Sequence, residues 1–268
     1  MLSSVKVKEV MSALERFAPL PLQESWDNAG LQMGLTEAEV SGALLCLDVN
    51  ETVIDEALRR GCNLVVSHHP LLFRGLKQIC GFDQVQRTVM KALKNDVAIV
   101  SMHTNMDNAW GGVNFKMAEK MGAHVVETTE GGADVLACGS KAGSMVVAEL
   151  AEPLSAEAFI LRMKQAFGVR CAMCNELLHR PIRRVAICGG AGDFMLPDAI
   201  KAGADAFVTG EMHYHVYAGH EQELQICVIG HYESEQFTTE LFRDIIRQHC
   251  PGVPVSIAET NTNPIKYY

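Results

Sequence analysis

The chain has 268 residues, of which 48% are hydrophobic and 21% charged, enough apolar material for a substantial core in one or two α/β domains. Its formal net charge of −9 argues against broad contact with nucleic-acid phosphate. No apolar run approaches the ~20 residues that a bilayer-spanning helix needs. The amphipathic pattern at 1–17 is not that of a signal peptide, so we expect a cytoplasmic protein.

Short apolar runs alternate with helical patterns over most of the chain, which is typical of parallel βα units. The sequence predicts strands at 42–49, 63–66, 97–102, 135–138, 145–151, 185–188, 206–209, 226–229 and 255–258. It predicts helices at 1–17, 51–60, 83–94, 113–121, 156–167, 196–202 and 234–249. We therefore expect an α/β fold with mainly parallel strands, in two intimately packed halves, 1–128 and 129–268.

The two halves resemble each other weakly. Residues 57–67, ALRRGCNLVVS, can be laid on residues 199–209, AIKAGADAFVT, and in both a helix ends at glycine before a strand that ends in a hydroxyl residue. The alternative is that this similarity is a coincidence. A true repeat predicts two related α/β units packed around a shared site.

Two adjacent histidines follow the predicted strand at 63–66. The segment Ser67-His68-His69-Pro70 begins where that strand ends, and ligands of an open α/β sheet bind beyond the carboxyl ends of its strands. Neighbouring side chains on a regular strand point to opposite faces. Both imidazoles can therefore serve one site only if the chain turns here, which Pro70 favours. The alternative is a pair of capping or surface histidines.

A second polar motif, His103-Thr-Asn-Met-Asp107, directly follows the predicted strand at 97–102. It places an imidazole and a carboxylate directly after an apolar strand, where ordinary turn residues would be enough to connect the strand to the next helix. For Asp107 the competing interpretation is that it caps the next helix, a role that Asn108 or Asn114 could also fill.

A third motif, Gly230-His231-Tyr-Glu-Ser-Glu235, lies between the predicted strand at 226–229 and the last long helix. Side chains at i and i+4 share one helical face, so His231 and Glu235 can converge on one ion if the helix begins early enough. As an isolated pair, this spacing is more often structural than ligating.

The three motifs together predict a metal centre formed by His68, His69, Asp107, His231 and Glu235. Mixed nitrogen and oxygen ligands suit Zn, Fe, Mn, Ni or Co rather than Ca or Mg. Five ligands are more than one catalytic zinc usually takes, and a bridging carboxylate would let them bind two ions. Two ions about 3.5–4 Å apart can lower the pKa of a shared water and stabilise a hydrolytic transition state.

Other polar segments border this centre. The loop at 189–192, GGAG, could bind phosphate through its backbone N–H groups, but a tight turn beside the metal centre is favoured. Glu211, His213 and His215 follow the predicted strand at 206–209. His213 is a candidate for proton transfer, with an exposed histidine as the alternative. The polar turn at 26–30, WDNAG, either walls the pocket or packs at a subunit contact.

The cysteines give no sign of disulfides. Four of the nine, Cys46, Cys138, Cys188 and Cys227, lie in apolar strand-like runs and are expected to be small buried side chains. Cys171 and Cys174 form one C-x-x-C, but no second pair lies at zinc-ribbon spacing, so a metal or redox role there is disfavoured.

Five segments, in this order, resemble the signatures of one family. They are Glu24-Ser-Trp-Asp-Asn-Ala-Gly-Leu-Gln-Met-Gly34, Ser67-His-His-Pro-Leu-Leu-Phe73, His103-Thr-Asn-Met-Asp107, Gly189-Gly-Ala-Gly192 and Gly230-His-Tyr-Glu-Ser-Glu235. The family is that of the GTP cyclohydrolase I type 2 homologues, also called the Nif-three-like dinuclear metal proteins. The resemblance runs from end to end, and the length resembles the compact members, which lack an inserted central domain.

The resemblance implies a dinuclear site held by His68, His69, Asp107, His231 and Glu235. It also implies a toroidal homohexamer with the metal sites facing an interior cavity. The family pattern does not make His103 a ligand, so we expect it beside the ions, in proton transfer or substrate contact. His103 and His213 are therefore the predicted catalytic residues.

Two functions of different class are compatible with these residues. The first is a metal-dependent hydrolase acting on a cyclic C–N bond, with ring opening of a guanine nucleotide as the case that the resemblance implies. A triphosphate would need basic partners, for which Arg74, Lys77 and Lys116 are candidates. The second is a non-enzymatic ring, which stores metal or binds a partner and whose ions serve mainly structure.

Overall fold

The computed structural model describes residues 4–129, 143–266 and 268, and the chain divides into two compact units. The first unit comprises Met1–Met106 together with Thr238–Tyr268, and the second comprises Asp107–Phe237. The described strands form one sheet in each unit. The predicted strand at 135–138 lies outside the described residues.

The sheet of the first unit has the strand order β1-β4-β3-β2-β11. Its strands are β1 (Gly30–Met33), β2 (Ala43–Cys46), β3 (Leu64–Ser67), β4 (Ala98–Ser101) and β11 (Val255–Ile257). β11, β2, β3 and β4 run parallel, and β1 is antiparallel to β4. Ser67 pairs with Ser101 in the register of β3 and β4. The carboxyl ends of these two strands therefore meet at one edge of the sheet.

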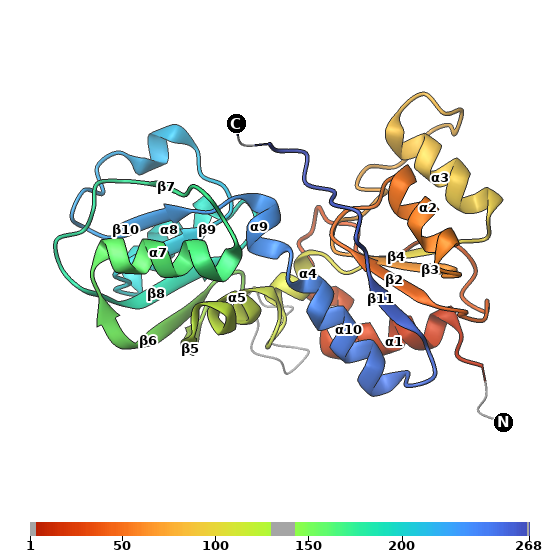
Figure 1. The fold of residues 1–268 in the computed structure, drawn as a ribbon, viewed down its shortest axis with the longest axis horizontal. Coiled ribbons are helices and arrows are strands. Elements are labelled where there is room, and N and C mark those ends of the chain that lie inside the picture. Colours follow the sequence, from red (N-terminus) through yellow and green to blue (C-terminus); the bar gives the residue numbers. More distant parts are fainter. Residues whose placement is uncertain (1–3, 130–142, 267) are drawn as a thin grey trace. The chain divides into compact units, whose positions relative to one another are not determined.

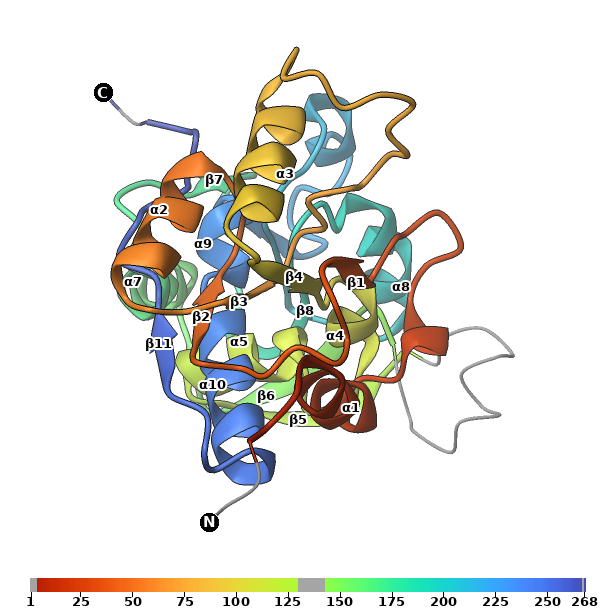
Figure 2. The same ribbon diagram turned by 90° about the vertical axis from the view of Figure 1, so that its right-hand side faces the viewer.

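Helices cover both faces of this sheet. They are α1 (Val7–Phe17), α2 (Glu51–Arg59), α3 (Gln84–Lys94) and α10 (Thr238–His249), with the short 3₁₀ helix η1 (Leu20–Leu22) after α1. α2 and α3 pack against Leu44, Val65 and Ile99 on one face, and α1 and α10 lie on the other (Figures 1 and 2). Every residue of β2, β3 and β4 is buried, as expected of parallel strands covered on both sides.

Side-chain caps fix where the helices beside the site begin. The carboxamide oxygen of Asn50 accepts from the backbone N–H of Val53 at 2.9 Å and starts α2. Asp83 accepts in the same way from Gln86 at 2.8 Å and starts α3. Both are preferred N-cap residues because their oxygens satisfy an N–H group that the helix leaves unpaired. α2 and α3 therefore begin at defined positions after β2 and after the long loop that follows β3.

The sheet of the second unit has the strand order β5-β6-β8-β9-β10-β7. Its strands are β5 (Ala123–Thr128), β6 (Val146–Leu154), β7 (Met173–Cys174), β8 (Ile182–Cys188), β9 (Ala206–Thr209) and β10 (Gln225–Val228). The central strands β8, β9 and β10 are parallel, whereas β5, β6 and β7 join through antiparallel pairings.

Two apolar layers sandwich this second sheet. Its helices are α5 (Val113–Met121), α7 (Ala156–Phe167), α8 (Leu196–Lys201) and α9 (His231–Glu235), with the 3₁₀ helices η2 (Asp193–Met195) and η3 (Tyr214–Tyr217). α5 and α7 pack on the face that carries Val185 and Ile187, and α8 packs on the face that carries Ala186 and Phe207 (Figures 1 and 2). This alternation follows from the twofold period of a strand.

The prediction of an α/β fold with mainly parallel strands is confirmed. The prediction of one helix at 234–249 is wrong, because α9 ends at Glu235 and α10 begins at Thr238. No glycine or proline marks this break. Short α4 (Thr104–Asn108) and the strands β1, β5 and β7 were not predicted. Among the described residues, no helix is both long and apolar enough to cross a membrane.

The two units differ from the predicted halves in where the chain divides. α5 and β5 lie within residues 1–128 but belong to the second unit, and α10 and β11 lie near the end of the chain but belong to the first. The first unit therefore combines residues 1–106 with the last segment of the chain, 238–268. That segment supplies β11, which pairs with β2.

Candidate metal centre

Three histidines of the first unit converge where two neighbouring parallel strands end. His68 and His69 follow Ser67, the last residue of β3, and His103 follows β4 after Met102. A ligand nitrogen from each of the three lies within 4.8 Å of those of the other two. The ring centroids of His68 and His69 are 5.0 Å apart, so the chain turns after β3 as two imidazoles at one site require. This group could hold a metal ion.

The tautomer of His68 is fixed by a backbone contact. Its Nδ1 lies 2.9 Å from the carbonyl oxygen of Met102. A carbonyl oxygen only accepts, so Nδ1 carries the proton of the neutral ring and Nε2 carries the lone pair. His68 is fully buried, and a buried neutral imidazole with its lone pair on Nε2 is a common metal ligand.

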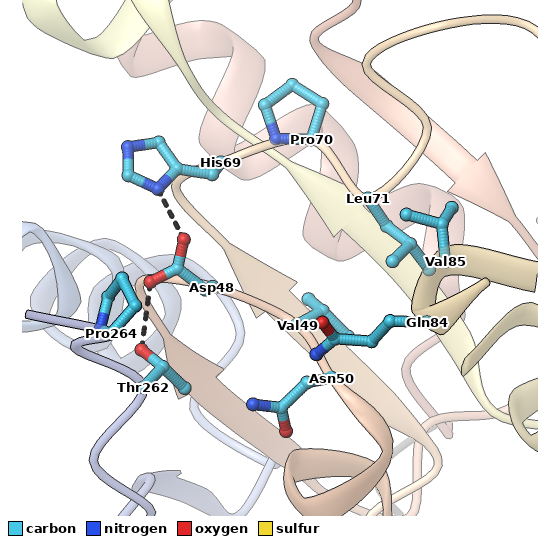
Figure 3. A pocket seen from close by; sticks show the side chains of 10 residues that line it. All are labelled: Asp48, Val49, Asn50, His69, Pro70, Leu71, Gln84, Val85, Thr262 and Pro264. Carbon is cyan, nitrogen blue, oxygen red and sulfur yellow. Dashed lines mark hydrogen bonds and ion pairs between the residues drawn. The ribbon is translucent and has the colours of Figure 1, made fainter. Parts of the chain in front are cut away.

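His69 and His103 are each oriented by a carboxylate. Nδ1 of His69 lies 2.7 Å from Oδ1 of Asp48 (Figure 3), and Nδ1 of His103 lies 2.7 Å from Oδ1 of Asp27. Histidine ligands of metals usually donate their other ring N–H to a carboxylate or carbonyl, which fixes the ring and raises its basicity. The donor chemistry of the three histidines therefore fits a transition-metal ion bound through Nε2.

The carboxylate of Asp27 has no exposed surface. Besides its contact with His103, it accepts hydrogen bonds from the backbone N–H of Thr104 at 3.1 Å and from the Thr104 hydroxyl at 2.5 Å. Burial by itself raises the pKa of Asp27, but the hydrogen bonds from His103 and Thr104 outweigh it, so the pKa is lowered overall. Asp27 is thus a buried anion beside His103.

Asp48 supports His69 from the end of a third parallel strand, because it follows β2 by two residues. Its Oδ2 accepts a hydrogen bond from the hydroxyl of Thr262 at 2.9 Å, so both of its oxygens are engaged (Figure 3). Asp48 was not among the residues predicted from the sequence. The signal that could have found it is its position at the carboxyl end of a buried strand, the place where the other candidates were sought.

In the second unit, His231 and Glu235 lie on one face of a single helix. α9 begins at His231, so the pair spans one helical turn, and Nε2 of His231 lies 3.1 Å from Oε2 of Glu235. Nδ1 of His231 lies 2.9 Å from Oε1 of Glu211. Glu235 is buried, with 4% of its side chain exposed. The early helix start on which the i, i+4 interpretation depended is therefore present.

The glycine loop at 189–192 is a tight turn packed against this helix. The backbone N–H of Gly189 donates to Asn114, that of Gly190 to the Ser234 hydroxyl, and that of Gly192 to the Thr209 hydroxyl. These three N–H groups are therefore not directed at a phosphate, and the structure supports the tight-turn interpretation. A Cβ atom at Gly190 would lie 2.4 Å from Oε1 of Glu235, so the turn needs glycine there.

Asp107 lies inside α4 and is half-buried. It does not cap the next helix, because the N-cap of α5 is Gly112. Burial raises the pKa of the Cys188 thiol, and the carboxylates of Asp107, Glu235 and Asp193 raise it further.

His213 lies in solvent and pairs with Asp193. Its side chain is 88% exposed, and its Nδ1 lies 2.5 Å from Oδ2 of Asp193. This hydrogen bond and the charge of Asp193 raise the pKa of His213 above its ordinary value. Its carboxylate partner leaves Nε2 on the solvent side, which is compatible with proton transfer and equally with a surface ion pair.

Cys171 and Cys174 do not face each other across a site. Cys174 pairs with Cys227 in the register of β7 and β10, and their sulfur atoms are 3.8 Å apart. Among the described residues, no cysteine joins a cluster of three side chains that could hold a metal ion. Among the described residues, the C-x-x-C spacing therefore does not correspond to a metal site.

Comparison with known proteins gives the family. Residues 5–264 match the family model described as Duf34/NIF3 (NGG1p interacting factor 3). The chain belongs to this family. Its resemblance to the GTP cyclohydrolase I type 2 homologues is confirmed as well, since a protein of that name from Clostridium perfringens is 34% identical over 232 residues, covering 86% of this chain and 87% of the relative. A relative of the same name from Clostridium acetobutylicum is 29% identical over 274 residues, covering 98% and 99%.

Solved structures support the Duf34/NIF3 fold over the whole chain. Staphylococcus aureus protein SA1388 matches with a TM-score of 0.88 and 25% identity, covering 98% of this chain and 99% of that one. A Bacillus cereus protein related to NIF3 matches with a TM-score of 0.87 and 23% identity, covering 99% and 100%. This Duf34/NIF3 chain therefore has the fold of its relatives and histidine and glutamate groups that could hold metal.

Proposed function

We propose that the protein is a hydrolase dependent on two transition-metal ions, which His68, His69, Asp107, His231 and Glu235 hold. The observation that carries this proposal is the orientation of His68 and His69, where an oxygen acceptor beside Nδ1 directs Nε2 for metal binding at each ring. His231 and Glu235, one turn apart on α9, supply a further imidazole and carboxylate.

The donor set indicates the kind of ion. Imidazole nitrogen combined with carboxylate oxygen suits Zn, Fe, Mn, Ni or Co, whereas Ca and Mg prefer oxygen alone. When bound, such ions lower the pKa of water toward neutrality and polarise the bond to be broken. The protein's own part is to hold the ligands, bind the substrate and move protons.

We assign proton transfer to His103, with Asp27 as the residue that positions it. The buried Asp27 carboxylate accepts from Nδ1 of His103, which leaves Nε2 as the nitrogen that exchanges a proton with the substrate. A buried anion at Nδ1 also stabilises the imidazolium that forms when Nε2 takes up a proton. His213, paired with Asp193, is the second candidate for this role.

The substrate that we propose is a compound with a hydrolysable cyclic C–N bond, of which the purine ring of a guanine nucleotide is the first case to test. Relatives with the name GTP cyclohydrolase 1 type 2 homolog support this choice. Hydrolysis adds a hydroxyl group to the ring carbon and a proton to the ring nitrogen as the C–N bond breaks. The reaction therefore needs neither oxidant nor reductant.

The second candidate function is a non-enzymatic metal-binding ring that recruits a partner. Large apolar side chains that are exposed to solvent favour it, among them Phe82, which is 87% exposed, and Trp26, which is 58% exposed.

We also propose that the chain assembles as a homohexamer, which a mass measurement in solution would test. A monomer at micromolar concentration would contradict the hexamer.

The experiment that separates the two functions combines metal analysis with a hydrolase panel that includes GTP and other cyclic amidines. A hydrolase should open the ring of at least one substrate, and chelation should abolish the turnover while re-addition of metal restores it. Fully metal-loaded protein that leaves every cyclic C–N substrate intact would contradict the hydrolase and favour the ring that binds a partner.

A further inference from the structure

A cavity of about 300 Å³ opens beside His69 within the first unit. His69, Asp48 and Thr262 lie on one side of it, and Gln84, Val85 and Leu71 lie on the other (Figure 3). The volume is at the lower end of the range typical of small-molecule sites. The cavity therefore has room for a compact ligand next to a predicted metal ligand.

The polar groups that this cavity offers to a ligand are carboxamides. Asn50 uses its carbonyl oxygen to cap α2 and to accept from the Thr52 hydroxyl at 2.6 Å, so its NH₂ group is the one suited to donate to a ligand. Gln84 is the first residue of α3 and is exposed, and it brings both a donor and an acceptor. Asp48 is different, because His69 and Thr262 already engage both of its oxygens.

The rest of the cavity lining is apolar. His69 is the one basic side chain among the ten lining residues. Val49, Leu71 and Val85 line it together with two prolines, and none of the ten lining residues is lysine or arginine. In the metal-free protein, an anionic group such as a phosphate would lie near the Asp48 carboxylate, and no lysine or arginine of the lining would balance its charge. A flat, neutral ligand with hydrogen-bonding edges fits better, because carboxamides recognise such edges and aliphatic side chains pack on its faces.

We infer that this cavity binds the planar nitrogen heterocycle of the substrate, a nucleobase in chemical class, and holds it beside His69. This inference rests on the proposed function in one respect, that His69 is a metal ligand. Binding of the heterocycle in the cavity does not require turnover. Asn50 and Gln84 contact the edge of the ring, and Val49, Leu71 and Val85 pack on its faces. Any phosphates of a nucleotide lie outside this cavity.

The test is equilibrium binding by calorimetry, with protein as purified and after chelation. Guanosine should bind in both states, whereas ribose 5-phosphate and inorganic triphosphate should not bind the chelated protein. Gln84→Leu should weaken guanosine binding about tenfold, because it removes two hydrogen bonds to the base. Gln248→Leu is the matched control, since Gln248 is exposed on α10 in the same unit and lies outside the cavity lining. It should bind guanosine like the wild type.

Val85→Phe provides a second variant that fills the cavity instead of removing a polar group, and it should weaken guanosine binding at least as much. Thermal unfolding of each variant establishes that it is folded. Equal guanosine affinity in the wild type, Gln84→Leu and Val85→Phe would overturn the inference. Binding of inorganic triphosphate to the chelated protein that guanosine does not displace would overturn it as well. Guanosine binding that depends on Gln84, in metal-loaded protein that turns over no cyclic C–N substrate of the panel, would contradict the hydrolase and leave the cavity assignment intact.

Discussion

The imidazole of His103 is held by the buried carboxylate of Asp27, with 2.7 Å between Nδ1 of the histidine and Oδ1 of the aspartate. The two residues are 76 positions apart in the sequence. Thr104 donates twice to the other oxygen of Asp27, once through its backbone N–H and once through its hydroxyl. The carboxylate cannot turn away without losing these contacts, so the orientation of His103 is fixed before any ligand binds.

Asp27→Asn should separate proton transfer from metal binding. The amide oxygen can still accept from His103, but the amide NH₂ then replaces the oxygen that accepts from Thr104, and no negative charge remains to stabilise an imidazolium. We expect turnover to fall about 10- to 100-fold, while the metal content falls far less than in His69→Ala. Asp244→Asn, at an exposed position on α10, is the control. Metal analysis and rates measured on the same samples check this, and an unchanged rate would contradict the role given to Asp27.

Gly190→Ala should displace a predicted metal ligand. Its Cβ would lie 2.4 Å from Oε1 of Glu235, and its backbone is left-handed, with φ +61°. Gly203→Ala is the matched control, because φ is +67° there and a Cβ meets nothing within 4 Å. Both variants should lose about 1–2 kcal/mol of stability from the strained backbone. Only Gly190→Ala should also lose bound metal, and equal metal content in the two variants would argue against Glu235 as a ligand.

Glu56 anchors the C-terminal segment of the first unit. Its carboxylate accepts from the backbone N–H of Glu259, from the backbone N–H and hydroxyl of Thr260, and from Arg60. Burial by itself raises the pKa of Glu56, but the bonds from Thr260 and Glu259 outweigh it and lower the pKa to about 2. Because the folded pKa lies below the ordinary value, the stabilisation is present above pH ~4.5 and is lost as the pH falls toward 2.

Glu56→Gln should therefore lower the free energy of unfolding at pH 7 by up to about 3 kcal/mol. The difference from wild type should shrink as the pH falls below ~4.5. Glu51 lies on the same helix as Glu56 and forms a partly exposed ion pair with Arg87 of α3. Glu51→Gln should therefore cost less than about 1 kcal/mol. Urea unfolding at several pH values measures both variants. A difference for Glu56→Gln that stays constant down to pH 3 would contradict the assignment.

Asp193→Asn should lower the pKa of His213. In the wild type, the hydrogen bond and charge of Asp193 raise this pKa above 6.5, so His213 stays protonated at a higher pH than an isolated histidine. An NMR titration of the imidazole signals, assigned with His213→Gln, checks the shift. If the His213 titration is the same with and without Asp193, the ion pair does not form in solution.

Some elements could be predicted to the residue because local chemistry marks both ends. The helix Ala156–Phe167 has Ser155 as its N-cap and left-handed Gly168 as its C-cap, and both signals are visible in the sequence. The buried strand Ala206–Thr209 is a short apolar run between turn residues. By contrast, β5 (Ala123–Thr128) is a largely exposed edge strand, so it lacks the apolar signature that marks a strand in the core.

The candidate site was predictable only in part. Polar motifs directly after buried strands pointed to His68, His69 and His103, because parallel strands bring their carboxyl ends to one edge. Asp27 could not be predicted as the partner of His103, since it reaches the ring from a loop 76 positions away in the sequence. Asp48 lies two residues after β2, so the same rule could have found it. The break between α9 and α10 was also missed. Gln236 and Phe237 fit a helix, and the division of the chain into two units, which falls between Phe237 and Thr238, is not visible in the sequence.

The central claim, that His68, His69, Asp107, His231 and Glu235 hold two ions, is tested most directly by metal analysis of the purified protein. Elemental analysis on a per-chain basis should find close to two transition-metal ions in the wild type. His69→Ala and Glu235→Ala should each reduce this sharply, while the thermal unfolding of the metal-free forms stays comparable. Full occupancy in a folded variant that lacks His69, Asp107 and Glu235 together would contradict the claim.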